Sequence, residues 1–279
     1  GLEKCRGDLM RFRAEYPINE IDCWTLVGDA VFNHDILLEM LKKIENPTGI
    51  SEAEKEYEVY RQPDNTHRYV IGVDPASSWS KRDYTGIVVV DIDSCSVVAD
   101  FLGHREAHHL ARWIAELSQE YNTASIYVES NGVGEAVLSH LIANGCPRVY
   151  HRKSSNPLGR GGKNRIPGWY SSMRTKAESI TVLQQLINDG SLTLYSRRLI
   201  KQLINYRGQW DGLQKDTKGG HFDLVAAMSV AAWAWRNECG KTSPARVDKQ
   251  EMVRKAWKRL LNRIDGGNTE WNSPWGRHL

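Results

Sequence analysis

Two apolar runs separated by a short polar segment decide the fold. They are Tyr69-Val70-Ile71-Gly72-Val73-Asp74-Pro75-Ala76 and Asp83-Tyr84-Thr85-Gly86-Ile87-Val88-Val89-Val90-Asp91. The pattern predicts two neighbouring strands joined by a polar connection. Asp74 therefore lies at the end of a strand. A carboxylate in that place either caps a turn, since Asp before Pro often opens one, or holds a positive group.

The rest of the chain places strands and helices around this pair. We expect strands at 69–73, 86–92, 96–101, 125–129 and near 148–150, helices at about 35–43, 106–121, 131–142, 176–189, 197–206 and 223–235, and a loop at 151–175. The first three strands are closely spaced, which indicates an antiparallel meander, and helices separate the later ones. This order predicts an α/β fold of the ribonuclease-H-like type (retroviral-integrase superfamily), with a mixed five-stranded sheet flanked by helices. A Rossmann sheet would need helices between its first three strands.

Composition is that of an ordinary globular protein. The chain has 279 residues, 41% of them hydrophobic and 25% charged, with a net charge of +3. Five scattered cysteines lack a C-x-x-C pair, which argues for a reducing compartment and against a disulfide framework or a cysteine zinc site. No apolar stretch approaches the roughly 20 residues of a membrane span, and no signal peptide opens the chain. We expect a cytosolic protein without membrane contact.

Three regions are expected along the chain. Residues 1–62 resemble a connector or the tail of another domain, residues 63–240 form the main domain, and residues 241–279 form a basic tail. The tail holds nine Lys and Arg against four Asp and Glu, and its apolar residues from Val253 to Ile264 predict one amphipathic helix. Such a helix either packs on the domain or docks on a partner.

Three acids occupy related positions in this topology. Asp74 ends the first strand, Glu129 ends the fourth, and Asp223 opens the last helix. The first and fourth strands are central neighbours, so the acids meet at one edge and repel one another unless cations neutralise them. Mg²⁺ and Mn²⁺ prefer such oxygen ligands, and two of these ions about 4 Å apart suit phosphodiester cleavage. Singly, each acid has a structural interpretation: a turn cap, an ion pair, or a helix-dipole partner.

The segment from His151 to Lys176 is basic and contains no Asp or Glu. Its cationic residues are Arg152, Lys153, Arg160, Lys163, Arg165, Arg174 and Lys176. Glycines make the segment flexible, and Trp169 and Tyr170 add stacking surface. These features suit contacts to DNA phosphates that do not depend on base sequence. The alternative is a solvated surface loop.

Several short motifs, taken in order, carry a resemblance. They are Gly72-Val73-Asp74-Pro75-Ala76, Asp83-Tyr84-Thr85, Val128-Glu129-Ser130-Asn131-Gly132-Val133-Gly134, Gly168-Trp169-Tyr170, Arg174-Thr175-Lys176 and His221-Phe222-Asp223-Leu224-Val225-Ala226-Ala227. Together they resemble the nuclease domain of the large terminase subunit of tailed bacteriophages. Glu15-Tyr16-Pro17 and residues 27–32 resemble the segment with which that family leaves its ATPase motor.

The resemblance implies a function and a site. The family cuts concatemeric viral double-stranded DNA during genome packaging, with two divalent cations, Mg²⁺ or Mn²⁺. The matching acids here are Asp74, Glu129 and Asp223. Where the family often has His-Asp-Asp, this chain has His221-Phe222-Asp223, so one acid is missing beside the second cation. Oxygen ligands or supporting hydrogen bonds could come from Asp83, His221 and Asp216, and a phosphate contact from Lys81 or Arg82.

The resemblance also implies partners. These are double-stranded DNA, an ATPase motor domain of the same polypeptide, the portal protein and the small terminase subunit, in the host cell cytoplasm rather than the mature virion. The motor motif is missing, because Gly240-Lys241-Thr242 has Trp235 where a Walker A loop needs its first glycine.

Other functions stay open at this point. One is a DNA or portal clamp with weak or no cleavage in isolation. Another is the nuclease core of a resolvase or transposase. Sugar-kinase and chaperone ATPases share a Gly-x-Asp start but need two such lobes, and the chain has length for one. Gly132-Val133-Gly134 lacks the third glycine of a dinucleotide site.

Overall fold

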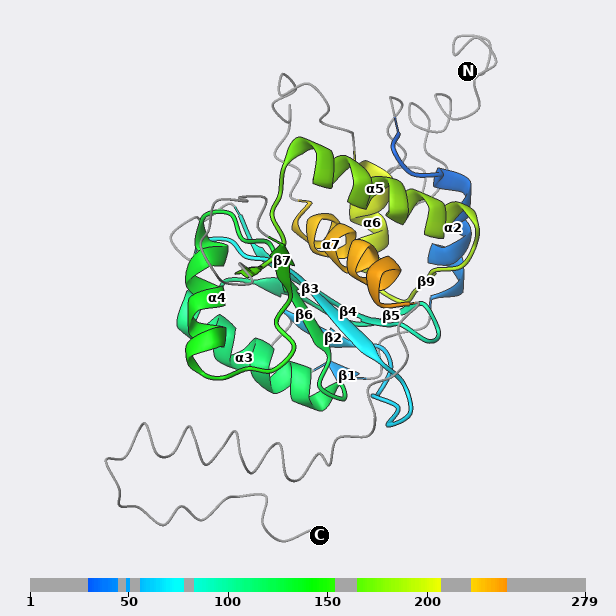
Figure 1. The fold of residues 1–279 in the computed structure, drawn as a ribbon. Coiled ribbons are helices and arrows are strands. Elements are labelled where there is room, and N and C mark those ends of the chain that lie inside the picture. The colour runs from blue at the N-terminus through cyan, green and yellow to red at the C-terminus, as the bar shows by residue number, and fades with distance from the viewer. Residues whose placement is uncertain are drawn as a thin grey trace, which may run out of the picture.

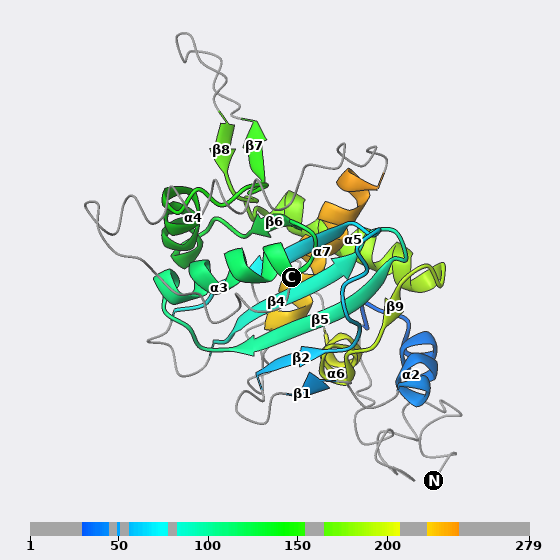
Figure 2. The ribbon, with the colours of Figure 1, turned by 90° about the horizontal axis from the view of Figure 1, so that it is seen from below.

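The computed structural model describes residues 30–44, 49–50, 56–77, 83–153, 165–206 and 222–239. Its main sheet has strand order β1-β2-β5-β4-β3-β6, and β9 also pairs with β5 (Figure 2). The strands are β1 (Gly49–Ile50), β2 (Tyr57–Val59), β3 (Tyr69–Asp74), β4 (Thr85–Asp91), β5 (Ser96–Gly103), β6 (Ser125–Val128) and β9 (Thr193–Leu194).

The predicted meander is confirmed. β3 pairs antiparallel with β4, and β4 pairs antiparallel with β5. β6 runs parallel to β3, as expected for a strand that returns through a helix. β3, β4 and β6 are buried almost throughout, which explains why they appear in the sequence as continuous apolar runs rather than alternating ones.

Helices cover both faces of the sheet (Figure 1). One face carries α3 (Ala107–Glu120) and α4 (Val133–Ala143); the other carries α5 (Met173–Asn188), α6 (Arg197–Asn205) and α7 (Asp223–Glu238), with α2 (His34–Lys43) beside α6. No helix within the described residues is long and apolar enough to cross a membrane.

Each face has its own apolar core. On one side Leu110, Ile114 and Leu117 of α3 are buried against the sheet, as their helical spacing predicts. On the other side α7 lies over β3 and β4, with Leu224 and Met228 fully buried. The small side chains of α7 bring its backbone close to the sheet, and this closeness sets the position of the acid at its first residue.

Two local features differ from the expectation. The region expected as a loop contains an antiparallel pair, β7 (His151–Lys153) and β8 (Arg165–Pro167), which stands away from the sheet in Figure 2. The strand expected near 148–150 is reduced to one bridge between Ile126 and Val149. Arg148 adopts a left-handed backbone with φ of 62°, which interrupts an extended ladder at that residue.

The segment expected as a connector also contributes to this fold. β2 pairs with β5, and the apolar face of α2, including Leu37 and Leu41, belongs to the core beside α6. The division of the chain at residues 63 and 240 stays a prediction. The helix expected in the basic tail lies outside the described residues.

Candidate active site

Asp74 and Glu129 follow from the pairing of two parallel strands. Val73 of β3 lies opposite Val128 of β6, so Asp74 and Glu129 come next on adjacent strands. The Glu129 amide donates a hydrogen bond to the Val73 carbonyl at 2.9 Å, which extends the ladder by one residue. The sheet thus places both acids at one edge, which is formed by the carboxyl ends of β3 and β6, as predicted.

Asp223 reaches the same edge from α7. Asp74 pairs with Gly86 on β4, and the backbone of Asp223 lies directly over Gly86. A Cβ at Gly86 would lie 2.3 Å from the Asp223 carbonyl oxygen, so only glycine permits this approach. The Tyr84 amide donates to Asp223 Oδ2 at 3.4 Å. The three predicted acids therefore converge.

A side chain from another helix fixes the start of α7. The Gln202 amide oxygen accepts hydrogen bonds from the amides of Leu224 at 3.0 Å and Val225 at 3.3 Å. It thereby satisfies donors that a helix N-terminus leaves free. The N-cap residue Phe222 makes no side-chain cap of its own. Sequence analysis missed Gln202, because a cap supplied from α6 leaves no local signal.

Phe222 stands where the resemblance predicts a second acid. Its ring packs edge-on against Tyr206 with centroids 5.3 Å apart, beside the core of the α6 and α7 face. The side chain that replaces an acid therefore serves packing here.

The electrostatics of Asp74 set it apart from an ordinary surface acid. Burial raises the pKa of the Asp74 carboxyl well above its usual range. The negative charges of Glu129 and Asp223 raise it further, as does a hydrogen bond with Glu129, while the positive charge of Lys176 opposes the rise. Such an arrangement favours binding of a cation, since a positive charge among the acids would relieve their repulsion.

The turn after Glu129 is also built on close contact. A Cβ at Gly134 would lie 1.7 Å from the Glu129 carbonyl oxygen, so α4 begins directly against the acid. Asn131, between them, donates from its side-chain amide to the Ser171 carbonyl at 2.9 Å. This bond ties the Glu129 turn to the segment that leads into α5.

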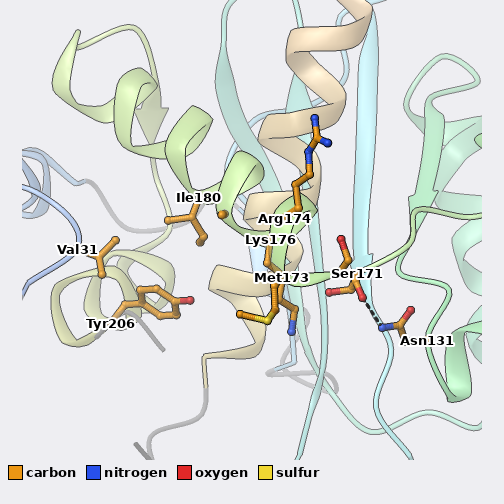
Figure 3. A pocket seen from close by; sticks show the side chains of 10 residues that line it. Val31, Asn131, Ser171, Met173, Arg174, Lys176, Ile180 and Tyr206 are labelled. Carbon is orange, nitrogen blue, oxygen red and sulfur yellow. Dashed lines mark hydrogen bonds between the residues drawn. The ribbon is translucent and has the colours of Figure 1, made fainter. Parts of the chain in front are cut away.

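A cavity of about 540 Å³ opens beside this edge. Figure 3 shows Asn131 and Ser171 on one side, Val31 and Tyr206 on the other, and Lys176 between them. One wall is polar and close to the acids, and the opposite wall is apolar. Lys176 thus lines this cavity, and its positive charge also acts on the carboxyl of Asp74.

The predicted basic residues fall into different environments. Lys153, Arg165 and Lys176 are exposed. Arg174 is exposed too and pairs with Glu178 at 2.9 Å. Arg152 turns inward: its guanidinium donates to the Ser130 hydroxyl at 2.9 Å and lies 5.1 Å from the centre of the Tyr170 ring. Arg152 therefore braces the turn after Glu129, and a DNA contact from it stays a prediction.

Asp83 is exposed and lies just before β4. The other predicted site residues lie outside the described part of the chain. They are Lys81, Arg82, Arg160, Lys163, Asp216 and His221.

The acids fit divalent cations. Asp74, Glu129 and Asp223 converge from β3, β6 and α7 and offer carboxylate oxygens, the ligands that Mg²⁺ and Mn²⁺ prefer.

Comparison with known proteins agrees with this geometry. The family model of the terminase RNaseH-like domain matches residues 71–234. This chain belongs to that family. The match contains Asp74, Glu129 and Asp223, so all three acids lie inside the family domain. The ribonuclease-H-like fold predicted from the order of elements is confirmed.

Solved structures show the same fold. The large terminase nuclease of the thermophilic phage G20c is 21% identical, with a TM-score of 0.53 over 73% of this chain and 97% of that chain. A magnesium-bound form gives 0.54 at 21% identity, over 75% of this chain and 98% of that one. The nuclease domain of Thermus phage P74-26 is 19% identical, with a TM-score of 0.51 over 78% and 100%. Comparison with curated proteins gave no match.

Proposed function

We propose that this domain is a metal-dependent endonuclease that cuts concatemeric viral double-stranded DNA during genome packaging. One observation carries the proposal: three acids from β3, β6 and α7 converge at one sheet edge in a chain of the terminase RNaseH-like domain family. The magnesium-bound nuclease of phage G20c supports the choice of a divalent cation.

The acids would hold two Mg²⁺ or Mn²⁺ ions, with Asp74 between Glu129 and Asp223. When bound, such ions supply an activated water and stabilise the charge on the phosphate oxygens. In the hydrolysis, water adds to phosphorus, the bond from phosphorus to the 3′ oxygen breaks, and that oxygen leaves with a proton. The Lys176 side chain lines the cavity beside the acids, and its positive charge opposes the rise in the pKa of Asp74, so we assign it a contact with the scissile phosphate.

The DNA would lie along the exposed cations of the β7 and β8 pair and the first turn of α5. Lys153, Arg165 and Lys176 present positive charge there, and contacts from such side chains to phosphates carry no sequence information. Cutting with little sequence preference follows. We extend the proposal to the assembly: a motor domain of the same polypeptide, the portal and the small terminase subunit, in the host cytoplasm.

A plasmid assay tests the proposal. Supercoiled DNA is incubated with the chain and Mn²⁺, Mg²⁺ or EDTA, and nicked and linear forms are quantified. We expect metal-dependent cutting that Asp74→Asn and Glu129→Gln abolish. Asp189→Asn is the matched control, because Asp189 caps the far end of α5 from Lys176 and should leave cutting intact.

The outcomes separate the alternatives. Cutting that persists in Asp74→Asn would reject the assigned centre. DNA binding without cutting in any metal would favour the clamp function. A strong preference for branched DNA or for transposon ends over plain duplex would favour a resolvase or transposase core.

A further inference from the structure

A second group of potential metal ligands comes from α3 and α4 and shares no residue with the three acids. Glu106, His108 and His109 stand at the start of α3, and their ligand atoms all lie within 4.8 Å of one another. The Nδ1 atom of His108 is 3.5 Å from Glu106 Oε2, and the rings of His108 and His109 have centroids 3.9 Å apart. A fourth candidate ligand, His140, comes from α4, with its ring 6.3 Å from that of His108. We call these four residues the histidine cluster.

The side chain of Glu106 faces the imidazoles rather than its own helix. Glu106 is the N-cap residue of α3, yet its side chain makes no capping hydrogen bond. The residues preferred at that position, Asn, Asp, Ser and Thr, accept hydrogen bonds from the first amides of the helix, and Glu106 does not. Its carboxylate lies toward His108 instead, where it offers an oxygen ligand beside the imidazole nitrogens.

Two arginines close to the cluster in sequence form ion pairs with other acids. Arg105 pairs with Glu56 at 2.7 Å, and Arg112 pairs with Glu116 at 3.1 Å. The positive end of the α3 dipole disfavours a cation, and the charge of Glu106 opposes that effect.

The ligand chemistry selects a particular class of ion. Imidazole nitrogen suits Zn²⁺, Co²⁺ and Ni²⁺, whereas Mg²⁺ prefers carboxylate, carbonyl and water oxygens. Zinc bonds to histidine nitrogen are about 2.0 to 2.1 Å long, so two ligands of one ion lie no more than about 4 Å apart. His108 and Glu106 are 53% and 63% exposed, so small side-chain rotations can close the cluster around an ion.

We propose that Glu106, His108, His109 and His140 form a second cation site, selective for a zinc-class transition ion over Mg²⁺, that links α3 to α4. The site shares no residue with the proposed nuclease centre. Binding would stabilise the contact between the two helices that cover one face of the sheet, because the ion binds the folded arrangement and not the unfolded chain.

The test uses the full chain with two of the three acids at the sheet edge neutralised. In an Asp74→Asn, Glu129→Gln background, zinc chloride is titrated calorimetrically and the melting temperature is followed with and without the ion. We expect one zinc ion per chain, a higher melting temperature, and no comparable response to magnesium chloride. His108→Ala and His140→Ala should each weaken zinc binding by roughly tenfold or more.

His67→Gln is the matched control, since His67 pairs with Asp91 away from the histidine cluster and should leave zinc affinity unchanged. Circular dichroism checks that each variant is folded, which the exposure of both mutated residues favours. Unchanged affinity in either His108→Ala or His140→Ala would overturn the proposal. Equal affinity for zinc and magnesium would also overturn it. So would zinc binding that appears only at concentrations where zinc binds elsewhere on the protein surface.

Discussion

Two acids of one sheet, Asp100 fully buried and Asp74 partly buried, have opposite electrostatic surroundings. Asp100 of β5 is 0% exposed, and Arg198 of α6 donates to its carboxylate from Nε at 2.7 Å and also from a terminal nitrogen. Asp74 of β3 has two acids as neighbours instead, with Lys176 the opposing charge. A permanent counter-ion belongs to a structural acid. An acid grouped with other acids is prepared for a cation that comes from solution.

The largest effect is expected from removing the charge of Asp74. In Asp74→Asn, cutting in saturating Mn²⁺ should fall about a thousandfold, within the range seen when one preorganised charge contact is lost. Metal-free stability should not decrease, because the substitution removes repulsion among the acids. Plasmid cutting and urea unfolding measure the two quantities. A variant that unfolds more easily than the wild type would contradict the contrast with Asp100.

Breaking the other pair should destabilise the fold whether or not metal is present. Arg198→Met leaves Asp100 buried without its partner, at an expected cost of about 3 kcal/mol in the free energy of unfolding. Urea denaturation with and without Mg²⁺ measures it. Arg174→Met is the control, since its exposed pair with Glu178 should contribute less than about 0.5 kcal/mol. Equal effects of the two substitutions would remove the distinction.

Gly86→Ala sharpens the comparison by moving an acid without changing charge. The added Cβ would meet the Asp223 carbonyl at 2.3 Å, so the start of α7 must shift. We expect a cost of about 1 to 3 kcal/mol, as for overpacking in a core, and weaker cutting that higher Mn²⁺ restores in part. Ile87→Val, one residue along β4, changes packing at a fully buried position and serves as the control. Full cutting by Gly86→Ala would show that Asp223 need not stay in place.

The smallest effect is expected at Asp91, whose partner is a histidine that loses its positive charge as the pH rises. Asp91 is buried and pairs with His67 Nδ1 at 2.6 Å, and this hydrogen bond raises the pKa of His67. The stabilisation is complete below the unfolded pKa of about 6.5 and is lost as the pH rises through the raised folded value. Because His67 is half-exposed, we expect less than about 1 kcal/mol. The difference in unfolding free energy between wild type and His67→Gln should shrink between about pH 6 and about pH 9. A constant difference would contradict it.

The sequence was sufficient for the acids and insufficient for what holds them. Continuous apolar runs end at Asp74 and before Glu129, so pattern and topology predicted their meeting. Gln202 and Lys176 act on the acids from other helices, and no local pattern shows which distant atom a polar side chain reaches.

Charge pattern was a weaker guide than periodicity. Arg152 belongs to the predicted DNA-binding group, yet its guanidinium bonds to Ser130. The sequence gives the sign of the charge on a side chain but not the direction in which the side chain points. The short strands β1, β2, β7, β8 and β9 escaped prediction for a related reason, since two or three residues do not establish a period.

The arrangement of α7 has a consequence for the order of synthesis. Asp74 and Glu129 leave the ribosome well before Asp223, and α7 must be complete before it can pack across β3 and β4. A nascent or truncated chain therefore carries two acids without the third. If the domain cuts DNA as proposed, the ability to cut arises only when the last described helix docks, so unfinished chains are harmless to the genomes around them.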